Sequence, residues 1–287
     1  MPKSSSPKKT SPKKGSPKKG SPNKSGSPKN KTDKKSKKDK SPKSLELNDI
    51  EIRNAPITHV IFDLDGVLLN SVRYFELFVN KLCYPYEKYL SLSLKRKLKN
   101  KRIESAAKIV VRELGLPMTR KEFINYYKES TPCLLKSVEL LPGVSQIIEY
   151  FRKHKMPMAV VTESNEENYK YKISRHKLIF DKISFAVCYG SDPEARQGKP
   201  QPFIYEIAAS RFKDNVPSGP YNILVFEDTA DGVDAALAAR MKVVWIADRI
   251  IDASLHDFHS NLMVIDNLEN FKPELLRLPY RSQLYSI

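Results

Sequence analysis

Two aspartates stand two positions apart at the end of an apolar run. Asp63 and Asp65 follow the apolar residues 60–62, and Gly66 comes directly after them. A short buried strand that ends in Asp-x-Asp-Gly places both carboxylates at the carboxyl end of the strand, where parallel α/β sheets bind ligands. The simpler interpretation is a strand that stops at a polar turn. The pair alone does not decide between these two interpretations.

Further reactive groups follow along the chain in a fixed order. Thr162 ends a second apolar run, and Lys199 lies in a Gly-Lys-Pro loop. Glu227 and Asp228 end another apolar run. Phosphoryl transfer needs a nucleophile, hydroxyl donors and a cation for the charge on the phosphoryl oxygens. Distal acids can hold a Mg²⁺ ion, which removes the repulsion between carboxylates and phosphate. Each group alone could be a surface lysine, a strand-end hydroxyl or a helix cap, but the ordered set favours a phosphoryl-transfer site.

The segments that carry these groups alternate between strand and helix patterns from about residue 56. Short apolar runs predict buried strands at residues 59–62, 158–161, 183–187, 223–226 and 243–246. Helical patterns lie between them, at residues 143–154, 165–176, 204–212 and 233–240. This alternation predicts an α/β fold with a doubly wound, mostly parallel sheet and helices on both faces.

Residues 72–141 differ from the rest because they lack clear strand patterns. Helical periodicity is evident at residues 72–82 and 103–114, and Gly115 suits the end of the second helix. A helical insertion directly after the first strand is expected to form a lid over the site that this strand builds. The alternative is that these helices simply enlarge the core.

Taken together, the motifs resemble those of the haloacid dehalogenase (HAD) superfamily of phosphatases over about residues 56–277. The resemblance implies a Rossmann-like core formed by residues 56–71 and 142–277. It also implies that residues 72–141 form a helical cap of the C1 type, which closes over the site and excludes water.

The resemblance assigns a role to each reactive group. Asp63 would be the nucleophile that forms an aspartyl-phosphate, and Asp65 the general acid and base. Thr162 and Lys199 would bind the phosphate. A Mg²⁺ cofactor would be held by Asp63, the backbone carbonyl of Asp65, Glu227 and Asp228.

A narrower resemblance is to the pseudouridine-5′-phosphatase branch of this superfamily. It rests mainly on residues 141–143, 174–177, 190–193, 226–228 and 232–239. In that branch a lysine of the cap faces the substrate, and the spacing gives this role to Lys101. The resemblance implies a small phosphorylated metabolite as substrate, either pseudouridine 5′-phosphate or another nucleotide or sugar phosphate.

The chain also departs from the family pattern at several positions. Glu163 stands beside Thr162 where the family prefers Gly or Ser, and a carboxylate there is expected to repel phosphate or narrow the pocket. The other departures are Asn70-Ser71-Val72, Asn100, Phe203 and Arg240. Two alternatives therefore stay open. One is a catalytically weakened HAD domain that serves as a nucleic-acid- or chromatin-associated binding module. The other is a phosphomutase.

The N-terminal residues 1–44 have a composition of their own. They hold 16 Lys and 2 Asp, which is +14 of the formal net charge of +17, and they contain six Ser-Pro units. We expect residues 1–50 to be a disordered tail, because they offer almost no apolar surface to bury. The units resemble the SPKK repeats of histone tails. That predicts contact with DNA, RNA or an import receptor, and control by phosphorylation of the serines.

The composition also bears on the cellular compartment in which the chain is expected. Cys83, Cys133 and Cys188 are scattered without metal-ligand spacing, which suits a reducing compartment. No apolar run reaches the roughly 20 residues of a membrane span, and the N-terminus lacks a secretory signal pattern. We therefore expect a cytoplasmic or nuclear protein with no membrane partner, and a monomer.

Overall fold

The computed structural model describes residues 54–98, 101, 103–213, 215–247 and 260–279. The chain divides into two units, residues 1–45 and residues 46–287, and every described residue belongs to the second unit. The predicted tail and Asn100 lie outside the described residues. Within the described part, no helix is long and apolar enough to cross a membrane.

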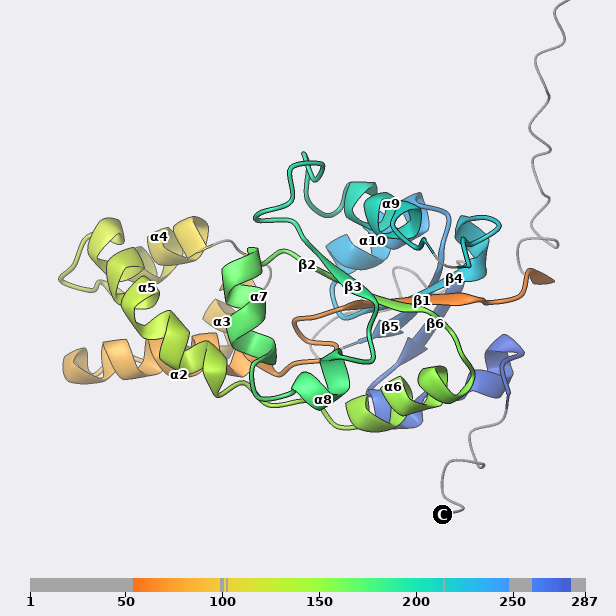
Figure 1. Ribbon diagram of the computed structural model, residues 1–287. Helices are drawn as coiled ribbons and strands as arrows, with labels where there is room; N and C mark the ends of the chain where they lie inside the picture. The colour runs from red at the N-terminus through yellow and green to blue at the C-terminus, as the bar shows by residue number, and fades with distance from the viewer. Residues whose placement is uncertain (1–53, 99–100, 102, 214, 248–259, 280–287) are drawn as a thin grey trace, which may run out of the picture. The chain divides into compact units, whose positions relative to one another are not determined.

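The described residues form one six-stranded sheet in which every pair of neighbouring strands is parallel (Figure 1). The strand order is β3-β2-β1-β4-β5-β6. The bounds are β1 His59–Asp63, β2 Met158–Thr162, β3 Phe185–Cys188, β4 Ile223–Glu227, β5 Lys242–Ile246 and β6 Leu262–Ile265. The predicted α/β fold with a doubly wound parallel sheet is confirmed. The edge strand β6 was not predicted.

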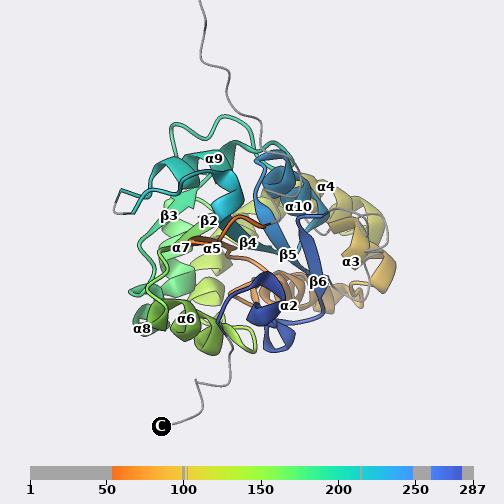
Figure 2. The ribbon, with the colours of Figure 1, turned by 90° about the vertical axis from the view of Figure 1, so that its right-hand side faces the viewer.

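Successive side chains of β1 point to opposite faces of the sheet, and each face is covered by helices. Val60 and Phe62 belong to the apolar cluster that includes α6 (Val144–Lys153). Ile61, which points the other way, belongs to the cluster built with α9 (Phe203–Ser210) and α10 (Ala230–Ala238). Figure 2 shows α9 and α10 on one side of the sheet and α6 on the other. Burial of β1 between two helical layers fixes the register of the strand that carries the first two acids.

The helix predicted at residues 165–176 is shorter than expected and is followed by a second one. The structure has α7 at Glu166–Ile173 and α8 at Lys177–Phe180. The side chain of Asn165 caps the start of α7 by accepting a hydrogen bond from the Asn168 N–H at 2.8 Å. At its end, the Ser174 hydroxyl donates to the Tyr171 carbonyl at 2.8 Å. Bonds of this kind compete with the helical ladder, which fits the end of the helix here.

The described residues of the segment predicted as the cap form the α-helices α2 Ser71–Cys83, α3 Leu92–Leu98, α4 Ile103–Leu114 and α5 Arg120–Lys136. They enclose a separate apolar cluster that includes Phe78, Val110 and Phe123. Thr119 and Glu122 form a capping box at the start of α5. The short 3₁₀ helices of the described chain are η1 Tyr84–Tyr86, η2 Pro220–Asn222, η4 Leu268–Asn270 and η5 Pro273–Leu276.

The cap segment leaves and re-enters the core at one place. Leu69 and Leu140 form an antiparallel bridge. The Asn70 N–H donates to the Glu139 carbonyl at 3.0 Å, and the Leu141 N–H donates to the Leu68 carbonyl at 3.0 Å. The two backbone segments that connect the core to the predicted cap are therefore hydrogen-bonded to each other shortly after β1.

Arg240, one of the departures from the family pattern, ends α10 in the left-handed backbone region with φ +62°. The Arg240 N–H donates to the Leu237 carbonyl at 2.8 Å, and the Met241 N–H donates to the Ala236 carbonyl at 3.1 Å. Glycine is favoured in this helix-ending motif because a Cβ atom is strained at positive φ. The family pattern has glycine here, and the structure gives the physical reason.

Candidate active site

The carboxyl ends of three neighbouring strands bring the predicted groups to one edge of the sheet. Asp63 is the last residue of β1, Thr162 the last of β2 and Glu227 the last of β4. β1 pairs with β2 on one side and with β4 on the other. Residues that are far apart in the sequence therefore meet, because parallel neighbours end at the same edge.

Lys199 joins two of these acids. Its Nζ lies 2.5 Å from Asp63 Oδ1 and also donates to Glu227 Oε1. Only 7% of the Lys199 side chain is exposed. Burial works against the charged form of Lys199, but the carboxylates of Asp63 and Glu227 outweigh it and raise the pKa of the lysine well above its usual range. Lys199 therefore stays a cation at neutral pH, beside the carboxylate predicted to attack phosphorus.

Glu227 is fully buried and both of its carboxylate oxygens are held by donors. Oε1 accepts from Lys199 and from the Tyr205 hydroxyl, which lies 2.5 Å away. Oε2 accepts from the Asp228 N–H, the Thr229 N–H and the Thr229 hydroxyl at 3.0, 3.2 and 3.1 Å. Sequence reasoning missed Tyr205. This network fixes Glu227 and, through it, the position of the Lys199 ammonium.

Three carboxylates converge where a metal ion was predicted. Asp63, Glu227 and Asp228 each offer an oxygen, and these oxygens lie within 4.8 Å of one another. A set of hard oxygen donors suits Mg²⁺. Gly66 makes room for this cluster: its φ is +93°, and a Cβ atom there would lie 2.3 Å from Asp228 Oδ2. The residues present therefore fit the cation that the motifs imply, and Glu227 is largely engaged by its neighbours.

The chemistry of Asp63 also calls for a nearby cation. Burial raises the pKa of Asp63 well above its usual range; Lys199 opposes this shift, and the negative charges of Glu227 and Asp228 add to it. A nucleophilic carboxylate must be ionised at working pH. A divalent cation among the three acids would favour the ionised form, which is a second reason why this donor set fits a metal.

Asp65 lies apart from that cluster and has partners of its own. Its carboxylate accepts from Lys172 at 2.5 Å, from Thr162 at 3.1 Å, from Ser164 at 3.4 Å and from Ser71. Burial raises the pKa of Asp65, but the Lys172 ammonium and the hydrogen bonds from Lys172, Ser71 and Thr162 outweigh it, so the pKa lies below the ordinary value. Asp65 is therefore held ionised in this arrangement, which is the form of a general base; to act as a general acid it must first bind a proton.

Sequence reasoning did not find Lys172 or Ser164. Lys172 lies three residues after Tyr169 and next to Ile173, on the inner face of α7, and it is 7% exposed. A lysine at a buried helical position is rare unless it is paired, so its place in the apolar stripe is the signal that could have revealed it. Thr162, the predicted phosphate-binding hydroxyl, is fully buried and faces Asp65.

Glu163, the departure from the family pattern beside Thr162, contacts the loop that carries Lys199. Its side chain is exposed, and its Oε1 accepts from the Lys199 backbone N–H at 3.2 Å. The carboxylate thus has a partner in the neighbouring loop.

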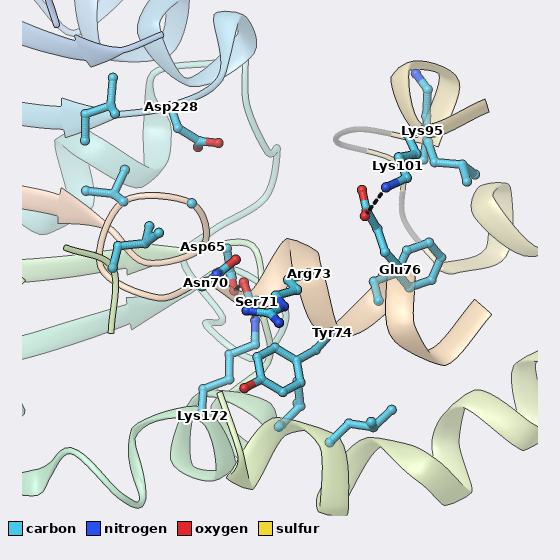
Figure 3. A pocket seen from close by; sticks show the side chains of 18 of the residues that line it. Asp65, Asn70, Ser71, Arg73, Tyr74, Glu76, Lys95, Lys101, Lys172 and Asp228 are labelled. Carbon is cyan, nitrogen blue, oxygen red and sulfur yellow. Dashed lines mark hydrogen bonds and ion pairs between the residues drawn. The ribbon is translucent and has the colours of Figure 1, made fainter. Parts of the chain in front are cut away.

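A cavity of about 810 Å³ separates the sheet edge from the cap helices (Figure 3). Its core side includes Asp65, Gly66, Lys172 and Asp228. Its cap side carries aromatic and charged side chains, among them Arg73, Tyr74, Glu76, Lys95, Arg96, Lys101 and Tyr127. Lys101, the predicted substrate contact, is exposed on this side. Lys95 and Glu76 pair at 2.5 Å, as the dashed line in Figure 3 marks. The cavity can enclose a substrate whose phosphate lies toward the core.

A parallel α/β sheet with an Asp-x-Asp strand end, a buried lysine and an acidic cluster, under a helical cap, defines a class of phosphoryl-transfer proteins. The chain matches the model of the haloacid dehalogenase-like hydrolase family over residues 60–246. It belongs to that family, and within it the chain is a phosphatase of the kind that acts on phosphorylated small molecules. The resemblance drawn from the motifs is thereby confirmed.

Two curated relatives are similar over most of their length. A Drosophila melanogaster protein named "Probable pseudouridine-5′-phosphatase" is 32% identical over 223 residues, which cover 78% of this chain and 95% of the relative. An Arabidopsis thaliana protein named (DL)-glycerol-3-phosphatase 2 is 35% identical over 225 residues, which cover 78% and 92%. The similarity spans the sheet and the cap together.

Solved structures resemble the chain in fold. A HAD family hydrolase from Deinococcus radiodurans, with bound phosphate and sodium, superposes with a TM-score of 0.64 at 19% identity and covers 78% of this chain and 97% of that one. A β-phosphoglucomutase from Clostridium difficile gives a TM-score of 0.56 at 19% identity, covering 77% and 96%. At such identities the likeness concerns the architecture alone.

Proposed function

We propose that this chain is a Mg²⁺-dependent phosphomonoesterase that hydrolyses a small phosphorylated metabolite through an aspartyl-phosphate intermediate. The observation that carries the proposal is the buried ion pair between Asp63 and Lys199, at 2.5 Å, beside two further acids. A carboxylate held next to a permanent cation and a cluster of oxygen ligands has the features that in-line attack on phosphorus requires.

The steps follow from the groups present. Asp63 attacks phosphorus, and the bond to the leaving oxygen breaks. Asp65 in its protonated form gives its proton to that oxygen, and as a carboxylate it then takes a proton from the water that attacks the aspartyl-phosphate. Lys199 neutralises charge on the nucleophile and on the phosphoryl oxygens. Thr162 supplies a hydroxyl next to Asp65.

A Mg²⁺ ion held by Asp63, Asp228 and Glu227, with the backbone carbonyl of Asp65, would supply charge neutralisation for the phosphoryl group. Side chains and backbone groups of the protein hold these ligands in place and exclude water. Tyr205 and the backbone N–H groups after β4 keep Glu227 in place. The cap helices exclude water from the cavity when they close over it.

Pseudouridine 5′-phosphate is the first substrate to test, with other nucleotides and sugar phosphates after it. The relatives' names include a pseudouridine-5′-phosphatase and a glycerol-3-phosphatase. A cavity of about 810 Å³ falls in the range of roughly 300–1,000 Å³ typical of small-molecule sites, and it leaves room for a substrate larger than glycerol phosphate. Aromatic Tyr74 and Tyr127 line its cap side and suit stacking on a base. The cationic Lys101 is proposed to contact the substrate.

The test is a phosphate-release screen of the purified full chain over pseudouridine 5′-phosphate, nucleotides and sugar phosphates, with Mg²⁺. We expect release from at least one of them, and a fall of several orders of magnitude in Asp63→Asn, because an amide cannot form the covalent intermediate. Asp181→Asn, an acid exposed on the surface, is the control and should be unaffected. A fully active Asp63→Asn protein would refute the mechanism. Activity that requires a bisphosphate and gives little net phosphate would indicate a mutase instead.

A further inference from the structure

Lys172 is a second buried lysine of the site, and the proposed reaction steps assign it no role. Only 9% of its side chain is exposed. Its Nζ lies 2.5 Å from Asp65 Oδ1 and 2.7 Å from Ser164 Oγ. Figure 3 shows Lys172 reaching from its helix toward Asp65 and Ser71. Burial of an ammonium is costly unless it is paired and hydrogen-bonded, so these contacts are what keeps it there.

Lys170, on the same helix, is a comparison because it occupies an ordinary exposed position. Lys170 is exposed and pairs with Glu166 at 2.6 Å along the helix surface. Exposed pairs of this kind contribute little, about 0–1 kcal/mol. Lys172, two residues further on, turns to the other face of α7 and into the cavity wall. The helix therefore offers a matched pair of lysines, one at the surface and one at the site.

The two catalytic acids each have a lysine of their own. Asp63 pairs with Lys199, and Asp65 pairs with Lys172. Among the described residues, Lys172 makes the one ion pair of Asp65. Its other partners, Ser71, Thr162 and Ser164, are hydroxyls. Without Lys172, a carboxylate that must reach the leaving oxygen would be oriented by hydroxyls alone.

We propose that Lys172 is a positioning residue of the reaction: its ammonium fixes the carboxylate of Asp65, and so the path of the proton to the leaving oxygen. This inference rests on the proposed phosphatase function. Proton transfer demands a donor within hydrogen-bond reach, about 2.6–3.2 Å. A misplacement of roughly 1 Å can cost about 100-fold in rate. An ion pair restricts Asp65 more strongly than neutral hydrogen bonds do.

The first experiment compares two leaving groups in the full chain with Mg²⁺. The variants are Lys172→Met, Lys172→Arg and the surface control Lys170→Met. With the best alkyl phosphate from the screen, Lys172→Met should lower kcat about 10- to 100-fold. With p-nitrophenyl phosphate the loss should be several-fold smaller, because p-nitrophenolate leaves without a proton. Lys172→Arg should recover part of the rate, and Lys170→Met should match the native chain.

The second experiment is a double-mutant cycle between Lys172→Met and Asp65→Asn on the alkyl phosphate. If Lys172 acts through Asp65, the double variant should be no slower than Asp65→Asn alone, because the effects of coupled residues do not multiply. Thermal unfolding of each variant separates loss of fold from loss of rate. If Lys172→Met does not fold, the cycle is run with Lys172→Arg.

Three outcomes would overturn the inference: an unchanged kcat in Lys172→Met, losses that multiply with Asp65→Asn, or an equal loss with both leaving groups. An unchanged kcat in Lys172→Met together with an active native chain would leave the phosphatase function intact. If the native chain releases no phosphate from any compound of the screen, the proposed function fails, and this inference fails with it.

Discussion

The carboxylate of Glu163 accepts a hydrogen bond from the backbone N–H of Lys199, with 3.2 Å between the nitrogen and Oε1. Gly198 makes this approach possible, because a Cβ atom there would lie 2.9 Å from the same oxygen. Glu163 follows Thr162 at the end of β2, so it ties the loop that carries Lys199 to the strand end that carries the buried hydroxyl.

A substitution at Glu163 should therefore reduce activity instead of restoring it. Glu163→Ser, which gives the residue type preferred by the family, removes the acceptor of the Lys199 N–H. We expect kcat to fall about 2- to 10-fold, in line with the roughly 0.5–1.5 kcal/mol of one hydrogen bond. Steady-state phosphate release measures it. Glu166→Ser, an exposed acid three residues on, is the control. A gain of more than tenfold in Glu163→Ser would mean that the natural chain is impaired by its glutamate.

Removal of the metal should abolish activity, and loss of one clustered acid should weaken Mg²⁺ binding. EDTA is expected to stop phosphate release and excess Mg²⁺ to restore it. Asp228→Asn should raise the Mg²⁺ concentration needed for half-maximal activity at least tenfold, because the amide loses the charge of a direct ligand. Asp231→Asn, an exposed acid in the first turn of α10, should leave that concentration unchanged. Full activity in EDTA would speak against a metal at this cluster.

Arg240→Gly should stabilise the protein. Arg240 has φ +62°, where a Cβ atom is strained and glycine is not. The net gain should be about 0.5–1 kcal/mol, after the larger loss of chain entropy for glycine is counted. The Tm of thermal unfolding should therefore rise by about 1–4 °C in a chain of this size. Arg240→Ala keeps the Cβ atom and should give no such gain. A Tm equal for the glycine and alanine variants would show that the strain is already relieved.

Residues 1–44 lie outside the described part of the chain, and their role stays a prediction. They carry +14, so the full chain should bind duplex DNA at 50 mM salt and lose most of that affinity by 200 mM, as counterion release requires. Deletion of these residues should abolish binding without a change in phosphate release. Phosphorylation of the six Ser-Pro serines, at about −1.5 to −2 each, should have the same effect on binding. Binding that survives the deletion would place the contact elsewhere.

Much of the architecture could be read from the sequence, because apolar alternation and strand-end motifs are local signals. β1 is such a case: its five residues are all buried, Asp63 ends the strand, and Asp65 follows two positions later. β6 was missed because Leu262–Ile265 is short, lies at the sheet edge and is only partly buried. Edge strands carry weaker patterns than central ones, since half of their environment is solvent.

The partners of the reactive groups were harder to predict than the groups themselves. Asp65 and Lys172 are 107 residues apart, and Tyr205 and Glu227 are 22 apart on different elements. Local sequence patterns do not predict which buried lysine pairs with which acid. These pairs depend on how α7 and α9 pack against the sheet. The predicted nucleophile, Asp63, could be proposed from a motif, whereas the residues that contact Asp65 could be found only from the fold.

The bridge between the two cap connections, at Leu69 and Leu140, has a consequence for how such a chain changes over time. Because the insert begins and ends at neighbouring backbone atoms, a different run of helices can replace it without moving β1 or β2. The groups that act on phosphorus would stay where they are, and the shape offered to the rest of the substrate would be new. New specificities can thus be acquired by exchange of one segment while the reaction itself is inherited unchanged.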